Sequence, residues 1–287
     1  MMFVGPRRVV PSSVVETDAL LRDPRAMRRW LAAAGSRIHG VDGVALCSVV
    51  PALDRTLSSA LRRATGKPVL RIRHTCRFPF RLKVADPRKL GADRLAAAAG
   101  AMTRPTSSAV IVDVGSALTV DLVKDGEFRG GLIMAGPGLG LWALGRYARR
   151  LPVVEFPIST SAPAIRFDDT EPSMVLGAQT AARGAVIEGV RLLRRSSRTA
   201  PTVFITGGAA HILGPHLPRA WRRDPHLVAR GLYRLWVLNP VSGPRVSRFP
   251  GGVSPNRTLG TGSRRAAPSR RTRSRVRSVP RSGQKKA

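Results

Sequence analysis

The sequence predicts an α/β fold in which helices pack on a sheet, and three observations favour this class. Short apolar runs bounded by Gly or Pro alternate along the chain with longer stretches whose apolar residues recur at helical spacing. Hydrophobic residues make up 43% of the 287 residues, which is enough for a sizeable core. Aromatic residues make up only 5%, so Ala, Val, Leu and Ile must form most of that core.

The beginning of the chain predicts a helix, a strand, a second helix and a second strand. Residues 17–35 start with capping residues, end at a glycine and carry apolar residues at roughly helical spacing. Residues 42–50 form an apolar run that stops at Pro51, which is typical of a buried strand. Residues 52–65 then predict a helix and residues 67–72 a strand. This alternation favours a layered α/β fold over a helical bundle.

The middle of the chain has the clearest pattern. Residues 89–102 are rich in Ala and predict a helix whose first turn carries Asp93 and Arg94. Residues 108–138 predict three strands joined by a Gly turn and by an Asp-Gly turn at 125–126, followed by a Gly-rich loop. A long helix, a strand that ends in a Gly pair and a last apolar stretch follow at residues 171–196, 202–208 and 227–235.

The charge of the chain is strongly basic and is concentrated at its end. There are 49 Lys and Arg against 17 Asp and Glu, a net charge of +32, and residues 241–287 contain 13 Lys and Arg but no acidic residue. This segment is rich in Pro, Gly, Ser and Arg and cannot bury enough apolar surface to offset its chain entropy, so it predicts a disordered basic tail. The simplest interpretation is a solvated tail. The alternatives are an arm that contacts nucleic acid without sequence preference through counterion release, and a frameshifted reading of the gene's end.

The cellular compartment follows from what the sequence lacks. Cys47 and Cys76 are too few for a disulfide framework, and without a Cys-x-x-Cys pair a zinc site is not expected. The first residues have no long apolar core of a signal peptide, and no apolar run reaches the ~18 residues of a membrane span. We therefore expect a cytoplasmic protein.

Two short motifs could carry phosphate chemistry. In residues 112–121, Asp113 ends an apolar strand and is followed by Gly115 and a hydroxyl residue, so backbone N–H groups could face a phosphate while the carboxylate holds a cation. Gly207 and Gly208 follow another apolar strand and could lie flat against an adenosine or a phosphate. Both patterns also occur in ordinary turns, and that interpretation stays open. The same holds for residues 130–138, which form either a phosphate-facing loop or a packing turn.

A third motif could carry acid–base chemistry. Asp93 and Arg94 lie at the start of a predicted helix, where an acidic residue is usually a cap or a partner of the helix dipole. A carboxylate there could instead act as a general base for a substrate hydroxyl, with Arg94 orienting an anion.

Taken in order, these segments resemble the type III pantothenate kinases, members of the superfamily of acetate and sugar kinases, Hsc70 and actin. The resemblance lies in the stretches CSVVP, DPRKLGADRLAAAAGA, IVDVGSALTVDLV with GGLIMAGPG, DTEPSMVLGAQTAARGAVIEG, TVFITGGAA and LVARGL, at residues 47–51, 86–101, 111–138, 169–189, 202–210 and 227–232. It implies two RNase-H-like halves around a cleft, usually in a homodimer. The implied division is a truncated first half at 1–90, a second half at 91–238 and the tail at 239–287.

The implied reaction is the ATP-dependent phosphorylation of pantothenate to 4'-phosphopantothenate, the first step of coenzyme A synthesis, with magnesium and a monovalent cation as cofactors. The family's GxDR motif falls on Gly91, Ala92, Asp93 and Arg94, which implies that these four residues line the pantothenate site and that Asp93 is the general base. The threonine of the family that contacts pantothenate matches Thr170.

The resemblance also places the ATP side. The strand-end aspartate of the family matches Asp113 and implies a ligand of potassium or ammonium. Ser116 stands where the family has a nucleotide-contacting threonine, and Gly207 and Gly208 fall in the ATP-side turn.

The chain departs from the family pattern at three places. Nothing before Pro11 matches the Asp-x-Gly-Asn-Thr phosphate loop of the first half, so we expect the chain to start after that loop and to lack part of the first half's core. Val84 replaces an aromatic residue, and Leu118 replaces a hydroxyl residue. The alternative function is therefore a catalytically inactive family member that acts as a binding or regulatory protein.

Overall fold

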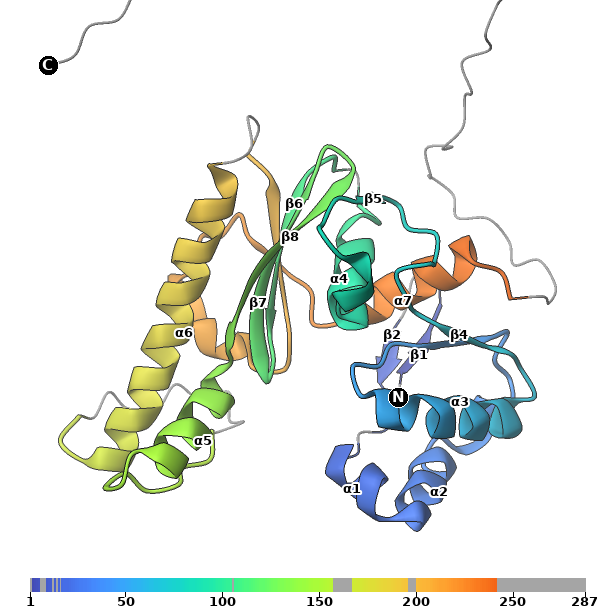
Figure 1. Ribbon diagram of the computed structural model, residues 1–287, viewed down its shortest axis with the longest axis horizontal. Coiled ribbons are helices and arrows are strands. Elements are labelled where there is room, and N and C mark those ends of the chain that lie inside the picture. Colours follow the sequence, from blue (N-terminus) through green and yellow to red (C-terminus); the bar gives the residue numbers. More distant parts are fainter. Residues whose placement is uncertain are drawn as a thin grey trace, which may run out of the picture. The chain divides into compact units, whose positions relative to one another are not determined.

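The computed structural model of the chain confirms the α/β class (Figure 1). It describes residues 2–5, 9–11, 13, 15, 17–104, 106–156, 167–195 and 200–241. The predicted basic tail, apart from its first three residues, lies outside this part of the chain. Among the described residues, none of the helices is both long enough and apolar enough to cross a membrane.

A six-stranded sheet lies at the centre of the described structure. Its strands have the order β10-β9-β6-β7-β8-β5. Strand β7 runs antiparallel to its neighbours β6 and β8, whereas β9 is parallel to β6, β10 to β9, and β5 to β8. In chain order these strands are β5 (Arg81–Leu82), β6 (Ala109–Val114), β7 (Ala117–Lys124), β8 (Glu127–Ala135), β9 (Thr202–Thr206) and β10 (Arg222–Arg223). The three consecutive strands predicted within 108–138 are therefore confirmed.

The turn between β7 and β8 also agrees with the sequence. Asp125 and Gly126 both have positive φ angles, 51° and 72°, which is the conformation that a two-residue hairpin turn requires. The predicted Gly-rich loop after β8 is only partly correct. Gly136 ends the strand, and Pro137 then occupies the first turn of a helix, α5 (Pro137–Tyr147), where its fixed φ and missing N–H are tolerated.

The two faces of the sheet carry different helices because successive strand residues point to opposite sides. One face packs against α4 (Ala92–Ala101) and α7 (Leu227–Leu238) through residues such as Ile111, Val123 and Phe204. The other face packs against α6 (Thr170–Arg194) and the 3-10 segment η3 (Ala210–His216) through residues such as Val112 and Val120. Figure 1 shows α6 and α4 on opposite sides of β6, β7 and β8.

Helices α4 and α7 touch at the level of their backbones. A Cβ atom on Gly100 would lie 2.1 Å from the carbonyl oxygen of Leu227, and one on Gly231 would lie 1.8 Å from that of Ala96. The Ala-rich sequence of α4 makes this approach possible because small side chains leave the helix backbones free to meet. The packing fixes α4 on the sheet, and with it the residues of its first turn.

The segment before β5 forms smaller units. Strands β1 (Met2–Val4) and β2 (Val9–Pro11) pair antiparallel, and β3 (Val44–Leu46) and β4 (Val69–Arg71) pair parallel, each in a two-stranded sheet. Helices α1 (Thr17–Arg22), α2 (Pro24–Ala32) and α3 (Pro51–Thr65) and the 3-10 segments η1 (Gly35–Ile38) and η2 (Pro87–Lys89) complete it.

The single helix predicted over residues 17–35 is wrong. The helical conformation is interrupted at Asp23, between α1 and α2. The carboxylate of Asp23 caps α2 by accepting a hydrogen bond of 2.7 Å from Arg25 N–H, and Pro24 is the first residue of α2. Pro disfavours helical backbone at the residue before it, so the helix has to end there and restart. The strand, helix and strand predicted at residues 42–50, 52–65 and 67–72 are confirmed as β3, α3 and β4, although both strands are shorter than expected.

Candidate active site

The face of the sheet that packs on α4 changes from apolar to polar along the strands. Ala109 and Ile111 belong to the core on this face, and the next residue of β6 on the same side is Asp113. Asp113 pairs with Thr119 in β7 and with Thr206 in β9, and the threonines are 8% and 2% exposed. The predicted strand-end carboxylate therefore lies in a row of oxygen-bearing side chains.

Glycines bring the turns after these strands close to Asp113. Gly207 follows β9 with a φ of +101°, and a Cβ atom there would lie 2.6 Å from Asp113 Oδ1 and 2.4 Å from the carbonyl oxygen of Val114. The backbone at Gly207 thus lies against the carboxylate with no space for a side chain. Gly208 and Ser116, in the neighbouring turns, are both exposed.

The loop after β8 packs on the turn after β6. Gly136 N–H donates a hydrogen bond of 2.9 Å to the carbonyl oxygen of Ser116, and a Cβ atom on Gly136 would lie 2.0 Å from that of Gly115. This contact supports the packing-turn interpretation of residues 130–138.

Helix α4 starts one residue before Asp93. Gly91 is the N-cap, and the carboxylate of Asp93 accepts a hydrogen bond of 2.8 Å from Arg94 N–H. A Cβ atom on Gly91 would lie 2.4 Å from Asp93 Oδ1, so the glycine leaves the space that the carboxylate occupies. Ala92 is buried in the core below. The predicted helix is confirmed with Asp93 and Arg94 in its first turn, although it begins at Ala92 and not at residue 89.

Asp93 and Asp113 lie close enough to affect each other electrostatically. Burial raises the pKa of Asp113 to about 6 from its ordinary value of 3.8, and the negative charges of Asp93 and Asp121 add to the rise. Burial, with the charges of Asp93 and Asp113, raises the pKa of Cys47 to about 12. The structure therefore brings together a helix start, a strand end and the loop after β3, which carries Cys47.

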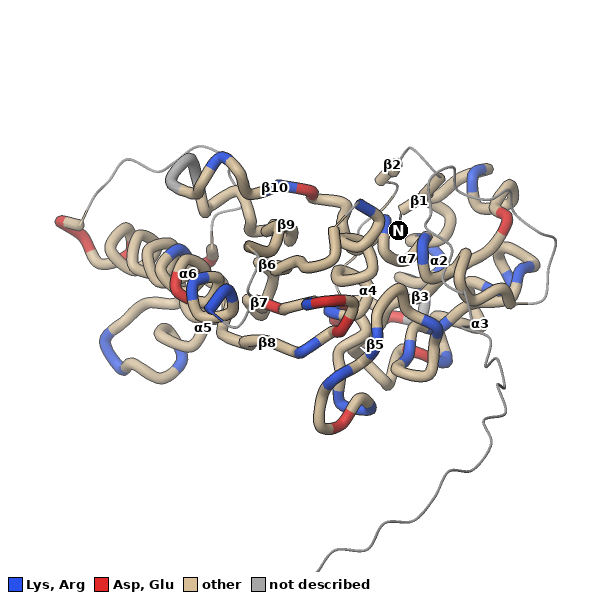
Figure 2. The backbone as a smooth tube through the Cα atoms, turned by 90° about the horizontal axis from the view of Figure 1, so that it is seen from above, with Lys and Arg blue, Asp and Glu red and all other residues tan. Residues whose placement is uncertain are grey.

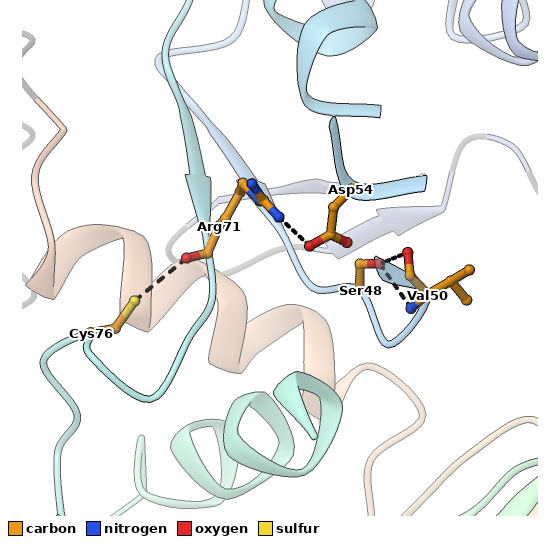
Figure 3. A network of polar contacts seen from close by, with 5 residues as sticks. All are labelled: Ser48, Val50, Asp54, Arg71 and Cys76. Carbon is orange, nitrogen blue, oxygen red and sulfur yellow. Dashed lines mark hydrogen bonds and ion pairs between the residues drawn. The ribbon is translucent and has the colours of Figure 1, made fainter. Parts of the chain in front are cut away.

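A network of polar contacts holds the loop after β3 (Figure 3). The Ser48 hydroxyl accepts a hydrogen bond of 3.2 Å from Val50 N–H, and Asp54 in α3 forms an ion pair with Arg71 in β4. The thiol of Cys76 donates to the carbonyl oxygen of Arg71 at 3.6 Å. Hydrogen bonding by Ser48, together with Arg71, lowers the pKa of Asp54. The Ser48–Val50 contact orders the loop that carries Cys47, and the ion pair joins α3 to β4.

The guanidinium of Arg94 pairs with a second aspartate. Its Nε lies 3.1 and 3.0 Å from the two carboxylate oxygens of Asp121 in β7, and its Nη2 also contacts Oδ1. Burial raises the pKa of Asp121, an effect that the paired guanidinium opposes. Sequence reasoning gave no role to Asp121 or Cys47. The available signal for Asp121 was a charged residue inside an otherwise apolar strand, which rarely occurs without a partner.

Thr170 lies apart from this group. It is the first residue of α6, where Asp169 caps the helix by accepting a hydrogen bond of 2.6 Å from Thr170 N–H. It lines a cavity of about 640 Å³ together with residues such as Leu144 and Phe167. Because α6 covers the face of the sheet opposite to α4, the structure does not bring Thr170 together with Asp93 and Asp113 within one chain.

The two replaced family positions also have clear places. Leu118 is fully buried in the core on the α6 side, so its side chain lies on the opposite face of the sheet from Asp113. Val84 is partly buried against the core on the α4 side.

The residues around Asp113 suit a hard monovalent cation. No group of three or more His, Cys, Asp or Glu side chains is placed to hold a metal ion together, as far as the described residues go. A carboxylate whose pKa is raised, flanked by two threonine positions, supplies the oxygen donors and the negative charge that such a cation prefers.

The chain is similar in sequence to a large group of kinases. The sequence model of the family described as type III pantothenate kinase matches residues 7–191. A protein of Chlorobaculum parvum named type III pantothenate kinase is 31% identical over 242 residues, which cover 83% of this chain and 90% of that protein. A protein of Chlorobaculum tepidum with the same name is 32% identical and covers 83% and 89%.

Solved structures show weaker likeness. A protein from Campylobacter jejuni described as a Baf family transcriptional activator has a TM-score of 0.47 and 19% identity, covering 68% of this chain and 82% of that one. A ROK hexokinase from Thermus thermophilus has a TM-score of 0.38 and 16% identity, covering 81% and 92%.

Proposed function

This chain belongs to the type III pantothenate kinase family, and from that premise we propose that it transfers the terminal phosphoryl group of ATP to the primary hydroxyl of pantothenate. The product is 4'-phosphopantothenate, and the reaction is the first step of coenzyme A synthesis. The observation that carries the proposal is the approach of Asp93, at the start of α4, to Asp113, at the end of β6.

Asp93 is the general base of the proposed reaction. Its carboxylate is only partly buried, and one of its oxygens is held by Arg94 N–H. It takes the proton of the pantothenate hydroxyl as that oxygen attacks the phosphorus, and ADP leaves with the former bridging oxygen. Gly91, in the same turn, lines the pantothenate side, and Ala92 contributes its backbone there because its side chain is buried in the core.

The turns around Asp113 form the ATP side. Phosphoryl transfer depends more on positioning and on neutralising charge than on covalent chemistry by the protein. Gly207 lets the backbone approach closely, and Gly208 and Ser116 are exposed in the neighbouring turns, where N–H and hydroxyl groups can meet phosphate oxygens. Asp113, with Thr119 and Thr206, would hold potassium or ammonium, which together with magnesium on the ATP phosphates would offset negative charge.

We also propose that the protein is a homodimer in which Thr170 serves the site of the partner. Thr170 belongs to α6 and Asp93 to α4, helices that cover opposite faces of the sheet, and a second copy of the chain would let the two residues meet. Large apolar side chains are exposed near Thr170, notably Trp142 (51%), Tyr147 (77%) and Phe167 (75%), and such a surface is typical of an interface.

Mixed dimers test this arrangement. The variants Asp93→Asn and Thr170→Ala are each expected to lose most activity alone. After mixing and random reassociation, one site of each hybrid dimer is intact, so about a quarter of the wild-type activity returns. Activity that stays absent on mixing, or a monomer in sedimentation analysis, contradicts the proposal.

A coupled-enzyme assay that detects ADP release tests the phosphoryl transfer itself. Release is expected to require both ATP and pantothenate, and Asp93→Asn to lower kcat by about 10²–10⁴-fold because it removes the base. Asp18→Asn is the matched control, since Asp18 lies in α1 with a side chain 73% exposed. Wild-type protein without turnover would favour the alternative, a non-catalytic relative that binds or regulates.

The described basic residues do not select a nucleic-acid function. Figure 2 shows Lys and Arg distributed over several elements, among them α3, α6 and the segment around β5. We propose separately that residues 240–287 contact nucleic acid without sequence preference. Deletion of these residues should then remove retention of the protein on heparin.

A further inference from the structure

We propose that Asp121 positions the general base Asp93 by acting through Arg94. In this proposal Arg94 is a positioning residue and not the ligand of the substrate's carboxylate. The inference rests on the proposed function, because it assigns a role within the same reaction.

The side chains of Arg94 and Asp121 form a pair with well-defined geometry. Arg94 and Asp121 lie 27 positions apart in the sequence and have side chains 12% and 2% exposed. The Nε atom of Arg94 is within 3.1 Å of both carboxylate oxygens, and Nη2 makes a further contact. Such a multipoint pair of planar groups fixes orientation as well as distance.

Both partners of this pair are themselves held in place. The guanidinium carbon of Arg94 lies 5.9 Å from the ring centre of Phe128, whose other neighbour is Phe80 at 5.9 Å. Asp121 pairs with Gly131 in β8, where a Cβ atom would lie 1.9 Å from the carbonyl oxygen of Val120. The register of β7 and β8 shifts directly after Asp121, a feature that re-aims side chains.

The charges of the two side chains offset each other. Arg94 is fully ionised, but its charge is matched by a carboxylate in direct contact, so the pair offers little net positive charge to an anionic substrate. A buried ion pair is also weak evidence for stability, because apolar residues of the same volume often serve as well. A role in positioning explains why charged groups occupy this place in the core.

The link to Asp93 is the backbone of Arg94. The same residue that is clamped to β7 through its side chain donates its N–H to Asp93 Oδ1 at 2.8 Å. The first turn of α4 is therefore tied to the sheet at the residue next to the base. We call the Arg94–Asp121 ion pair the clamp. Its loss would let the first turn of α4 move relative to Asp113, which lies on the same sheet as Asp121.

The test is the variant Asp121→Asn, assayed for ATP-dependent phosphorylation of pantothenate. A displacement of about 1 Å costs about 10²-fold in rate, so kcat should fall by about that factor while the KM for pantothenate changes little. Arg94→Lys keeps the charge but not the two-point pair, and it should show the same loss. The double variant should lose no more than either single variant, because both break one clamp.

The control is Asp224→Asn. Asp224 is also a buried aspartate paired with arginine, with Arg230 Nε at 2.9 Å and Arg104 Nη2 at 3.7 Å from its Oδ2, but these pairs lie near the start of α7. This variant should keep the wild-type kcat. If Asp121→Asn does not fold, Arg94→Lys carries the test with the same expected loss.

Several results would overturn the inference. Wild-type kcat in Asp121→Asn would do so, as would additive losses in the double variant. A raised KM for pantothenate with unchanged kcat in Arg94→Lys would show that Arg94 binds the substrate. If the wild type itself has no turnover, the proposed function fails separately. The clamp is then read from hydrogen exchange of residues 91–97, which Asp121→Asn must accelerate and Asp224→Asn must not.

Discussion

Asp113 should make the stability of the protein depend on pH in a way that its substitution removes. The pKa of Asp113 is raised to about 6 in the folded chain, whereas an aspartate in the unfolded chain titrates near 3.8. The folded state therefore holds this proton more tightly than the unfolded state. The stabilising contribution is fully present below about pH 4 and is lost as the pH rises through 6.

The size of the effect follows from the shift. A difference of about two pKa units corresponds to about 3 kcal/mol, so ionised Asp113 lowers the free energy of unfolding by about that amount above pH 7. Asp113→Asn has no charge to bury. The free energy of unfolding of Asp113→Asn minus that of the wild type should therefore increase by up to about 3 kcal/mol from pH 4 to pH 7.

Urea denaturation of both proteins across this pH range, in buffer without potassium or magnesium, measures the difference. Other groups titrate in both proteins and cancel. In an Asp93→Asn background the rise should move to lower pH, because one of the charges that raise the pKa of Asp113 is gone. Potassium should reduce the difference if it binds the ionised carboxylate. A difference that stays constant from pH 4 to pH 8 would refute the placement of Asp113 in a desolvated site beside Asp93.

Two further predictions concern the same site and its support. Cys47, with a pKa of about 12, should react with iodoacetamide at pH 8 about 10²-fold more slowly in the folded protein than in the denatured chain. Asp93→Asn should accelerate this reaction in the folded protein. Equal rates in the folded and denatured protein would contradict the burial of Cys47 near the two carboxylates. Gly231→Ala should lower the free energy of unfolding, measured in urea, by about 1–3 kcal/mol because the new Cβ meets the backbone of α4. Gly184→Ala, with open space around it in α6, should raise the free energy of unfolding by about 0.5–1 kcal/mol. An unchanged free energy of unfolding in Gly231→Ala would refute the close contact between α4 and α7.

Local sequence signals predicted much of the fold. The strands within 108–138 and their turn at Asp125 follow from apolar alternation and from turn chemistry that acts over a few residues. The helix predicted over residues 89–102 was found as α4, with Asp93 and Arg94 in its first turn, but it begins at Ala92 and not at residue 89. The break at Asp23 was missed although its cause is local, because a residue that caps a helix was read as part of its interior. Helix α5 was missed because its glycines obscure the helical period.

The site was predicted in part. The motifs selected Asp93 and Asp113, but their approach depends on α4 packing over one face of the sheet, which the backbone contact at Gly100 and Gly231 makes possible. No local pattern relates Asp121 to Arg94, since they meet only through tertiary structure. The opposite position of Thr170 likewise depends on which face of the sheet α6 covers.

The identity of the product tests the central claim most directly. The purified chain is incubated with ATP, magnesium, potassium and pantothenate, and the products are identified by mass spectrometry. We expect 4'-phosphopantothenate and ADP in equal amounts from the wild type. Both products should be lost from Asp93→Asn and Asp113→Asn, while Asp18→Asn should resemble the wild type. Phosphopantothenate formed equally well by Asp93→Asn, or none formed by the wild type, would contradict the central claim.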